Sequence, residues 1–358
     1  MRRTRFRRLA LAVIALLLRG GASIAQTPVQ ITEFPVGAEA IPITVGSDGN
    51  FWMTFNGGDS MGRMTPTGDV TAFHTGGGFP ETVFGHCVDG HDGGVWCSNG
   101  GGPIVRTDVA TGATSIFNGF PPDSGAGDIT LGPDGAIWFT DYNNRIGRMT
   151  TAGVVTEYPI PAAFIAPRTI TVGPDGALWF TSDIGQVGRL DTSGNGFVFY
   201  NLPEYPTLYA QLGAITSGPD GNLWLSVMTD GGLVRIVRLT PDGQFTEFPT
   251  TGPGSNILDI TAGPDGALWF TENATSRIGR MTVTGSLTEY SLAAGAGPLG
   301  ITVGRDGAIW FAEGGALKIG RLSGGPLPPA HPVPALSPAM LAILGAALAA
   351  AGWFLLRR

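Results

Sequence analysis

Short apolar runs separated by glycine-rich turns recur along the chain and predict β-strands. Residues 170–173 (Ile-Thr-Val-Gly) and 178–181 (Leu-Trp-Phe-Thr) are rich in β-branched and aromatic residues. Between them, residues 174–177 (Pro-Asp-Gly-Ala) predict a hairpin turn, because glycine adopts a positive φ without strain. Residues 187–190 predict a third strand, and residues 156–159 (Thr-Glu-Tyr-Pro) show the fourth strand of the preceding unit. The pattern therefore predicts a unit of four short strands.

This unit is repeated seven times. A tryptophan recurs at intervals of 41 to 45 residues, each time with Asp-Gly four and three residues before it and an arginine ten to fourteen residues after it. The seven tryptophans are Trp52, Trp96, Trp138, Trp179, Trp224, Trp269 and Trp310. Four strands in about 43 residues are typical of a propeller blade, which buries its two faces only by stacking on neighbours. We therefore expect an all-β fold, a seven-bladed β-propeller.

The two ends of the repeat array predict how the ring closes. A fourth strand follows each of the first six units, but after the seventh Leu322 runs directly into Gly324-Gly325-Pro326. A strand of the missing type, residues 31–35 (Ile-Thr-Glu-Phe-Pro), stands before the first unit. We expect this N-terminal strand to complete the last blade, which would remove two open sheet edges. The propeller would then form one domain over residues 26–325.

Composition agrees with an all-β fold and excludes one class of partner. The chain has 57 Gly and 27 Pro among 358 residues, and helices tolerate neither well. The formal net charge is −7, but eight of the arginines lie near the two termini. The rest of the chain carries 13 basic and 28 acidic side chains. Such an excess of acid repels phosphate backbones, so we expect no nucleic-acid partner.

The termini predict export and attachment to a membrane. Residues 1–25 combine a cationic head, an apolar run and small residues before Gln26, as in a signal peptide, although an uncleaved anchor is an alternative. Residues 326–338 are a Pro-rich spacer, and residues 339–358 are an apolar segment ending in two arginines, which predicts a C-terminal transmembrane helix. The propeller is thus expected outside the cytoplasm.

The C-terminal segment also resembles bacterial sorting tails of the PEP-CTERM and IPTL-CTERM kind. In those tails a short Pro-containing motif precedes one hydrophobic helix and a basic end, and Val333–Ser337 stands here in the place of the motif. The resemblance implies a bacterial cell-envelope protein that is anchored by this tail or sorted through it. A plain single-span anchor is the alternative.

The repeat unit itself resembles the virginiamycin B lyase (streptogramin lyase) family of seven-bladed propellers over residues 31–322. The similarity is carried best by Gly263–Asn273 followed by Arg277–Met281. The resemblance implies a lyase reaction in which a His removes the proton α to a carbonyl while carboxylates hold Mg²⁺. The two His positions of that family are Leu258 and Leu299 here, and leucine can neither accept a proton nor bind a metal.

The carboxylate positions of the family are also changed. Gly297 occupies the position of a family glutamate, and Glu313 lies one residue before the position of another acid. We therefore do not expect streptogramin lyase activity, although a Mg-dependent carbon–oxygen lyase stays an alternative.

Residue pairs just before each innermost strand should face the central opening. This predicts that His86, Asp128, Arg168 and Asp259 converge on one mouth of the ring. Acids three residues after the tryptophans would line the same end; they are Asp141, Glu272 and Glu313. Such a set suits a small polar ligand or a divalent cation, Mg²⁺ or Ca²⁺, for which Glu272 and Glu313 are the candidate ligands. The alternative is that these side chains are solvated or cap strands.

Three further features have mainly structural interpretations. The repeated arginines are expected to pair with acids of a neighbouring blade, and the Asp-Gly pairs to form hairpin turns and not calcium loops. Cys87 and Cys97 flank the second hairpin and could form a cross-strand disulfide in an oxidising compartment. Two buried thiols, or a metal site with His86 and His91, are the alternatives.

Together these features favour a membrane-tethered binding or interaction module at the cell envelope. Its partner would be a small polar ligand, or an envelope protein or glycan. The alternatives are the metal-dependent lyase and a structural protein of a surface matrix.

Overall fold

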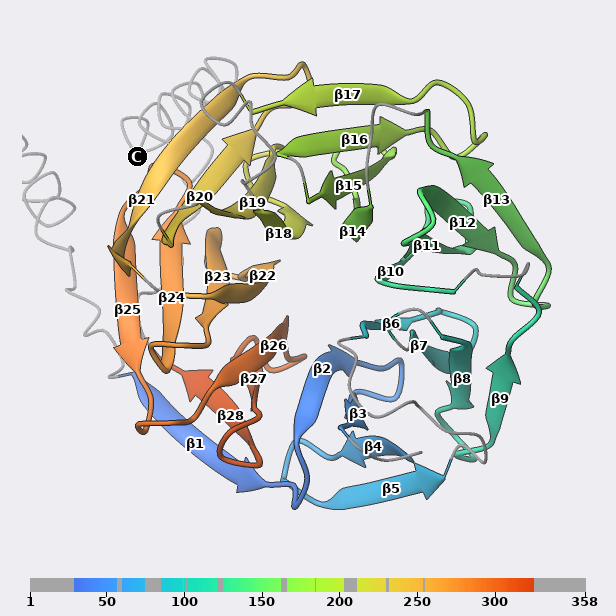
Figure 1. The fold of residues 1–358 in the computed structure, drawn as a ribbon. Helices are drawn as coiled ribbons and strands as arrows, with labels where there is room; N and C mark the ends of the chain where they lie inside the picture. The colour runs from blue at the N-terminus through green and yellow to red at the C-terminus, as the bar shows by residue number, and fades with distance from the viewer. Residues whose placement is uncertain are drawn as a thin grey trace, which may run out of the picture.

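The computed structural model is a closed ring of seven four-stranded antiparallel sheets (Figure 1). It describes residues 29–324 except 57–59, 75–84, 99, 101, 121–124, 162–165, 184, 203–210, 230–231 and 254. All regular elements in these residues are strands, 28 in number. The predicted signal peptide, Pro-rich spacer and C-terminal segment lie outside the described residues, and the part that is described contains no helix able to cross a membrane.

Each blade runs outward from the central opening, with its first strand innermost and its last on the circumference (Figure 1). Blade 1 consists of β2 (Ala40–Val45), β3 (Phe51–Phe55), β4 (Ser60–Met64) and β5 (Val70–His74). Blade 2 consists of β6 (Cys87–Asp89), β7 (Gly94–Cys97), β8 (Ile104–Asp108) and β9 (Thr114–Phe117). Blade 3 consists of β10 (Ile129–Leu131), β11 (Ile137–Asp141), β12 (Arg145–Met149) and β13 (Val155–Pro159). Blade 4 consists of β14 (Pro167–Val172), β15 (Leu178–Ser182), β16 (Gln186–Leu190) and β17 (Val198–Asn201).

The remaining blades follow the same order, and the last one closes the ring. Blade 5 consists of β18 (Gln211–Ser217), β19 (Leu223–Met228), β20 (Leu233–Leu239) and β21 (Phe245–Pro253). Blade 6 consists of β22 (Ile257–Ala262), β23 (Ala267–Glu272), β24 (Arg277–Thr282) and β25 (Leu287–Ser291). Blade 7 consists of β26 (Pro298–Val303), β27 (Ile309–Glu313), β28 (Lys318–Ser323) and, from the N-terminal end, β1 (Gln30–Pro35). The predicted seven blades and their closure by the N-terminal strand are confirmed.

The repeated tryptophan lies between its own blade and the next. Trp179 is fully buried and packs against Leu223, Leu225 and Val237 of blade 5. On its other side it stacks on Tyr200 of its own outer strand, with ring centroids 5.3 Å apart. The six other tryptophans of the ring make equivalent contacts, so the repeat period in the sequence is the period of inter-blade packing.

The repeated aspartate and arginine complete this unit within one blade. The Trp179 indole N–H donates to Asp175 Oδ1 at 2.9 Å, and Arg189 Nε donates to Asp175 Oδ2 at 2.7 Å. The arginine therefore pairs with the hairpin of its own blade, and our expectation of a partner in the neighbouring blade was wrong. The reason is the strand register, which sets Arg189 directly opposite Trp179. Gly176 in the hairpin has a φ of 74°, as expected for a turn.

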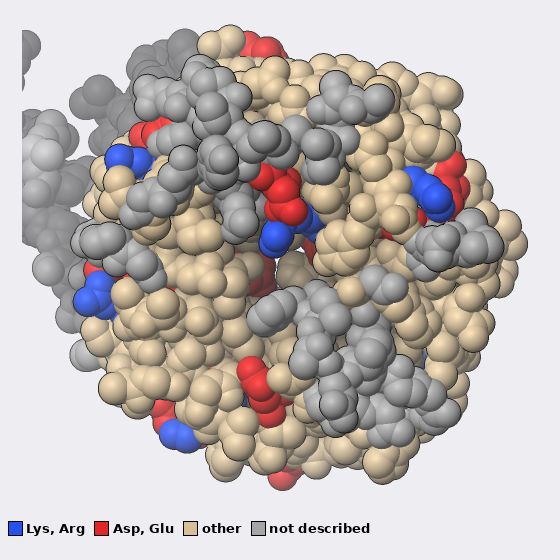
Figure 2. Space-filling model, in the orientation of Figure 1, with Lys and Arg blue, Asp and Glu red and all other residues tan. Residues whose placement is uncertain are grey.

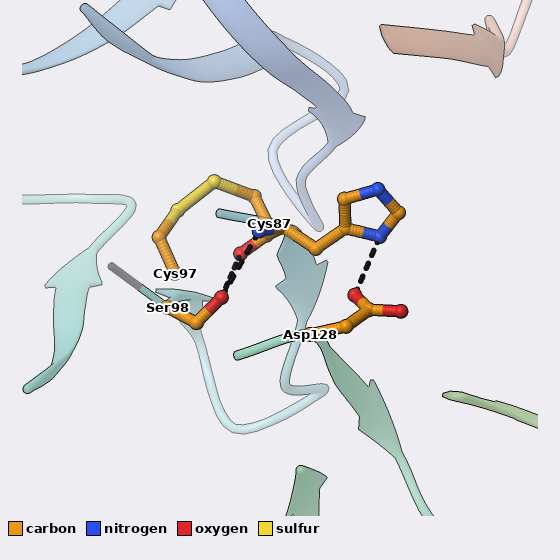
Figure 3. Close-up of a disulfide and its surroundings, with 5 residues drawn as sticks. Cys87, Cys97, Ser98 and Asp128 are labelled. Atoms are coloured by element: carbon orange, nitrogen blue, oxygen red, sulfur yellow. Dashed lines mark hydrogen bonds and ion pairs between the residues drawn. A yellow bond between two sulfur atoms is a disulfide. The ribbon is translucent and has the colours of Figure 1, made fainter. Parts of the chain in front are cut away.

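A disulfide joins Cys87 and Cys97 across the first hairpin of blade 2 (Figure 3). The two cysteines are directly opposite each other in the β6–β7 ladder. Ser98, the next residue, accepts a hydrogen bond from the backbone N–H of His86 at 3.0 Å. The disulfide therefore lies immediately beside the chain that reaches the centre of the ring.

Candidate functional site

Irregular backbone at the start of the inner strands brings two residues of each blade to the central opening. In five blades the pairing of the first two strands shifts at this point, as in a β-bulge, which directs side chains away from the regular ladder. The shifts include Arg168-Thr169, Leu258-Asp259 and Leu299-Gly300. In blades 2 and 3 the equivalent pairs directly precede β6 and β10. These are the pairs that sequence spacing assigned to the opening.

A hydroxyl two residues after the tryptophan fixes these pairs in several blades. Thr140 Oγ1 accepts the Asp128 N–H at 2.9 Å and donates to the Arg168 carbonyl of the next blade at 2.9 Å. Thr271 Oγ1 does the same for the Asp259 N–H and the Leu299 carbonyl, at 3.1 and 2.8 Å. Each hydroxyl therefore ties the irregular backbone of one blade to that of the next. The recurring Trp-Phe-Thr motif is the sequence feature that indicates this hydroxyl contact, and it was not among the predicted features.

The pairs surround a cavity of about 240 Å³ at the axis. His86, Asp128, Arg168 and Asp259 all line it, as their sequence positions predicted. In the face shown in Figure 2, acidic and basic side chains gather at the centre of the ring. The structure thus brings together four charged side chains from blades 2, 3, 4 and 6.

His86 and Asp128 form an ion pair across two blades. His86 Nδ1 lies 2.7 Å from Asp128 Oδ1, and the His86 side chain is 38% exposed to the cavity (Figure 3). Burial lowers the pKa of His86, but the charge and hydrogen bond of Asp128, with the charge of Asp259, outweigh it and raise the pKa to about 9. The imidazole is therefore cationic at neutral pH, and its Nε2 is a hydrogen-bond donor.

Removing Asp128 should lower this pKa. In an Asp128→Asn variant the imidazole loses its main counter-charge while the desolvation that lowers its pKa remains, so we expect the pKa of His86 to fall from about 9. Titration of the His86 ring by NMR measures it directly. An unchanged pKa would show that the ion pair does not form in solution.

Asp128 and Asp259 use their oxygens to hold the inner strands. Asp128 Oδ1 accepts the Ile129 N–H and Oδ2 the Ile170 N–H of the next blade, both at 2.8 Å. Asp259 repeats this arrangement with Ile260 and with Ile301, again at 2.8 Å. Burial raises the pKa of Asp259, against the charge of His86 and these two amides. Both carboxylates therefore join neighbouring blades by hydrogen bonds, and both also line the cavity.

Arg168 and Tyr142 complete the polar side of the cavity. Arg168 Nε pairs with Asp183, and 46% of the Arg168 side chain is exposed. Tyr142 lines the same cavity, and its pKa is raised mainly because the hydroxyl is partly desolvated. Tyr142 and Asp183 both lie four residues after a tryptophan. Tyr142 was not among the residues predicted to line the opening.

Leucines form part of the opposite wall. Leu258 and Leu299 both line the cavity, and they pack with Ile41 in one apolar cluster. A Cβ atom built on Gly314 would lie 2.5 Å from Leu299 Cδ1, so the Leu299 side chain occupies the space in front of residue 314. Leu299 itself is 7% exposed. These leucine side chains offer a ligand only hydrocarbon, although Asn256 and Asp259 line the cavity from the same blade as Leu258.

Asp141, Glu272 and Glu313, which we expected at the same end, do not line the cavity. They are the last residues of β11, β23 and β27, and Tyr142, one residue after Asp141, lines the cavity instead. Asp141 faces Arg145 across the strand pair, at 3.8 Å. Glu272 Oε2 accepts the Thr275 hydroxyl at 2.9 Å. Burial raises the pKa of both Glu272 and Glu313 to about 7.

These carboxylates do not build a metal site. Among the described residues no group of three or more His, Cys, Asp or Glu side chains is placed to hold a metal ion. Glu272 and Glu313 belong to different blades, and each is buried within its own sheet. The Mg²⁺ that the family resemblance implied therefore does not fit the residues present at Leu258, Leu299, Gly297 and Gly314.

Comparisons with known proteins agree with the repeat and the ring. The model of the virginiamycin B lyase family matches residues 27–208 and 185–355, which together cover most of the chain. The chain belongs to the virginiamycin B lyase family. A solved streptogramin B lyase structure is 32% identical and superposes with a TM-score of 0.75, covering 85% of this chain and all of that one. No curated protein sequence matches the chain.

A second solved family member carries a substituted histidine. It is a catalytically inactive His→Ala variant of virginiamycin B lyase from Staphylococcus aureus, in complex with quinupristin. It is 32% identical to this chain, with a TM-score of 0.74, and the match covers 83% of this chain and 99% of that one. In that virginiamycin B lyase, loss of one histidine accompanies loss of catalysis.

Proposed function

We propose that this family member binds a small ligand in its central cavity and does not open streptogramins. The observation that carries the proposal is Leu299, whose side chain fills the space in front of Gly314 where the family resemblance requires a histidine and an acid. The cavity lies at the axis of the ring and is lined by both charged and apolar side chains, as is typical of a small-molecule site. We further propose that it works outside the cytoplasm, tethered at the bacterial cell envelope, as the two ends of the sequence suggest.

Lyase activity is tested by incubating the purified chain with quinupristin and Mg²⁺. Ring opening by elimination leaves the mass unchanged, so the product is separated from the substrate by liquid chromatography. We expect no conversion above a protein-free control, with virginiamycin B lyase from Staphylococcus aureus as the active reference. Conversion that requires Mg²⁺ would contradict the proposal.

Binding is tested with phenylacetamide, a neutral probe that has one apolar and one polar end. Saturation-transfer NMR should detect the probe on the wild-type chain and lose the signal in a Leu299→Trp variant, whose larger side chain fills the cavity. Tryptophan fluorescence and melting temperature verify that the variant is folded. A probe signal that is absent from the wild type, or unchanged in the variant, would count against a ligand site at the axis.

A further inference from the structure

The polar groups of the cavity differ in how much hydrogen-bonding capacity they have left. The acceptors are largely used, because both oxygens of Asp128 and both oxygens of Asp259 accept backbone N–H groups at 2.8 Å. Asp128 also contacts His86, and its side chain is only 8% exposed. A cationic ligand would have to compete with the amides that join neighbouring blades.

The donors, in contrast, are available. His86 uses Nδ1 for Asp128, and within the described part of the chain no group bonds to its Nε2. Arg168 has five N–H donors, of which Nε meets Asp183, and nearly half of its side chain is exposed. Both residues line the cavity, and both flank Asp128: His86 bonds to one of its oxygens, and Ile170, two residues after Arg168, bonds to the other. Two charged donors therefore lie on the same side of the axis.

Apolar side chains make up much of the other side of the cavity, where Asn256 and Asp259 also lie, and they suit a different part of the ligand. Ile41, Leu258 and Leu299 come from blades 1, 6 and 7, and they continue into Val227 and Val234 of blade 5. A polar group placed against these side chains would lose its hydration without gaining a partner. A ligand that satisfies both walls has an apolar body and one head group that accepts hydrogen bonds.

We propose that the ligand is a small amphiphilic carboxylate, held by His86 Nε2 and the Arg168 guanidinium, with its hydrocarbon part on Leu258 and Leu299. Hydrogen bonds from charged donors to a carboxylate are stronger than those to a neutral carbonyl, which favours the acid over its amide. This inference rests on the ligand-binding function proposed above, and it names the chemical class of that ligand.

Three probes that share one ring and differ in the head group test it: phenylacetate, phenylacetamide and 2-phenylethylamine. With the full chain at pH 7, we expect phenylacetate to bind about tenfold more tightly than phenylacetamide, and 2-phenylethylamine more weakly than both. Equal affinity for acid and amide would overturn the carboxylate assignment but leave the binding function intact. Failure of all three to bind would instead remove the binding function.

Variants then identify the donors. Arg168→Gln should reduce phenylacetate affinity about tenfold while changing phenylacetamide affinity less than twofold. His86→Asn should act in the same direction, because an Asn amide can still reach Asp128 but lacks the Nε2 donor. Arg189→Gln is the matched control, since Arg189 makes the same kind of ion pair, with Asp175 in the same blade, but lies away from the cavity.

Folding of the variants is verified by melting temperature, and Arg168→Ala, which also removes the charge, replaces Arg168→Gln if that chain does not fold. An equal loss of phenylacetate and phenylacetamide binding in the Arg168 variant would show that Arg168 shapes the cavity and does not bind the carboxylate. Loss of phenylacetate binding in the Arg189→Gln control would likewise contradict the assignment.

Discussion

Deletion of the closing strand β1 is expected to lower the melting temperature of the propeller by roughly 10 °C or more. β1 forms a ladder of six residue pairs with β28 and supplies the outer strand of blade 7. Its Phe34 stacks on Trp310, with ring centroids 5.4 Å apart, and belongs to the apolar cluster between blades 7 and 1. Without β1, β28 becomes an open edge and Trp310 loses one face of its packing. Thermal unfolding of chains that begin at Gln26 and at Val36 measures the difference.

Two point variants in β1 separate the stability contributed by the packing of Phe34 from that contributed by the strand itself. Phe34→Ala should destabilise the protein by about 3 kcal/mol, as for other aromatic side chains cut back to alanine in a packed site. Ile31→Ala, in the same strand, should cost much less, because Ile31 is 36% exposed. Equal effects of the two variants, or an unchanged melting temperature for the chain that begins at Val36, would contradict closure by β1.

Replacement of Glu313 by Gln is expected to stabilise the protein above pH 7 by roughly 2–3 kcal/mol. Glu313 is fully buried at the end of β27, and neither carboxyl oxygen has a hydrogen-bond partner among the described residues. Burial, and then the charge of Glu33, raise the pKa of Glu313 from 4.5 to about 7, while Lys318 acts in the opposite direction.

The direction of the pH dependence follows from this shift. The unfolded chain releases the Glu313 proton near pH 4.5, whereas the folded chain holds it up to about pH 7. The unfolding free energy therefore falls as the pH rises between these values and stays at the lower level above pH 7. Urea denaturation of wild type and Glu313→Gln at several pH values tests this, and the curves should converge near pH 4. A constant difference across the range would mean that Glu313 does not titrate in the folded protein.

Structure that follows from short, repeated contacts could be predicted from the sequence. The Asp-Gly turn, the tryptophan and the arginine all lie within one blade, so a single unit carried the information for all seven. The spare strand at residues 31–35 was visible because one unit lacked its fourth strand. Four of the side chains predicted at the axis line the cavity, because the same offset before each inner strand leads to the opening; they are His86, Asp128, Arg168 and Asp259.

The acids at the ends of β11, β23 and β27 were the main error within this periodic part. Asp141, Glu272 and Glu313 do not line the cavity, whereas Tyr142, one residue after Asp141, does. The lack of a histidine in the last two blades was visible from the sequence. That Leu299 fills the space before Gly314 was not, because the two residues meet only through the irregular start of β26.

By itself, the sequence determined that this protein is a ring of seven four-stranded blades closed by its own N-terminal strand, because those features depend on residues that are neighbours within one repeat. Only the tertiary structure decided what the centre can do. His86 meets Asp128, and Asp128 meets Ile170, across blades some 40 residues apart in the chain. Whether a carboxylate there faces a ligand or ties two strands together depends on the meeting of different blades at the axis, which no single repeat specifies.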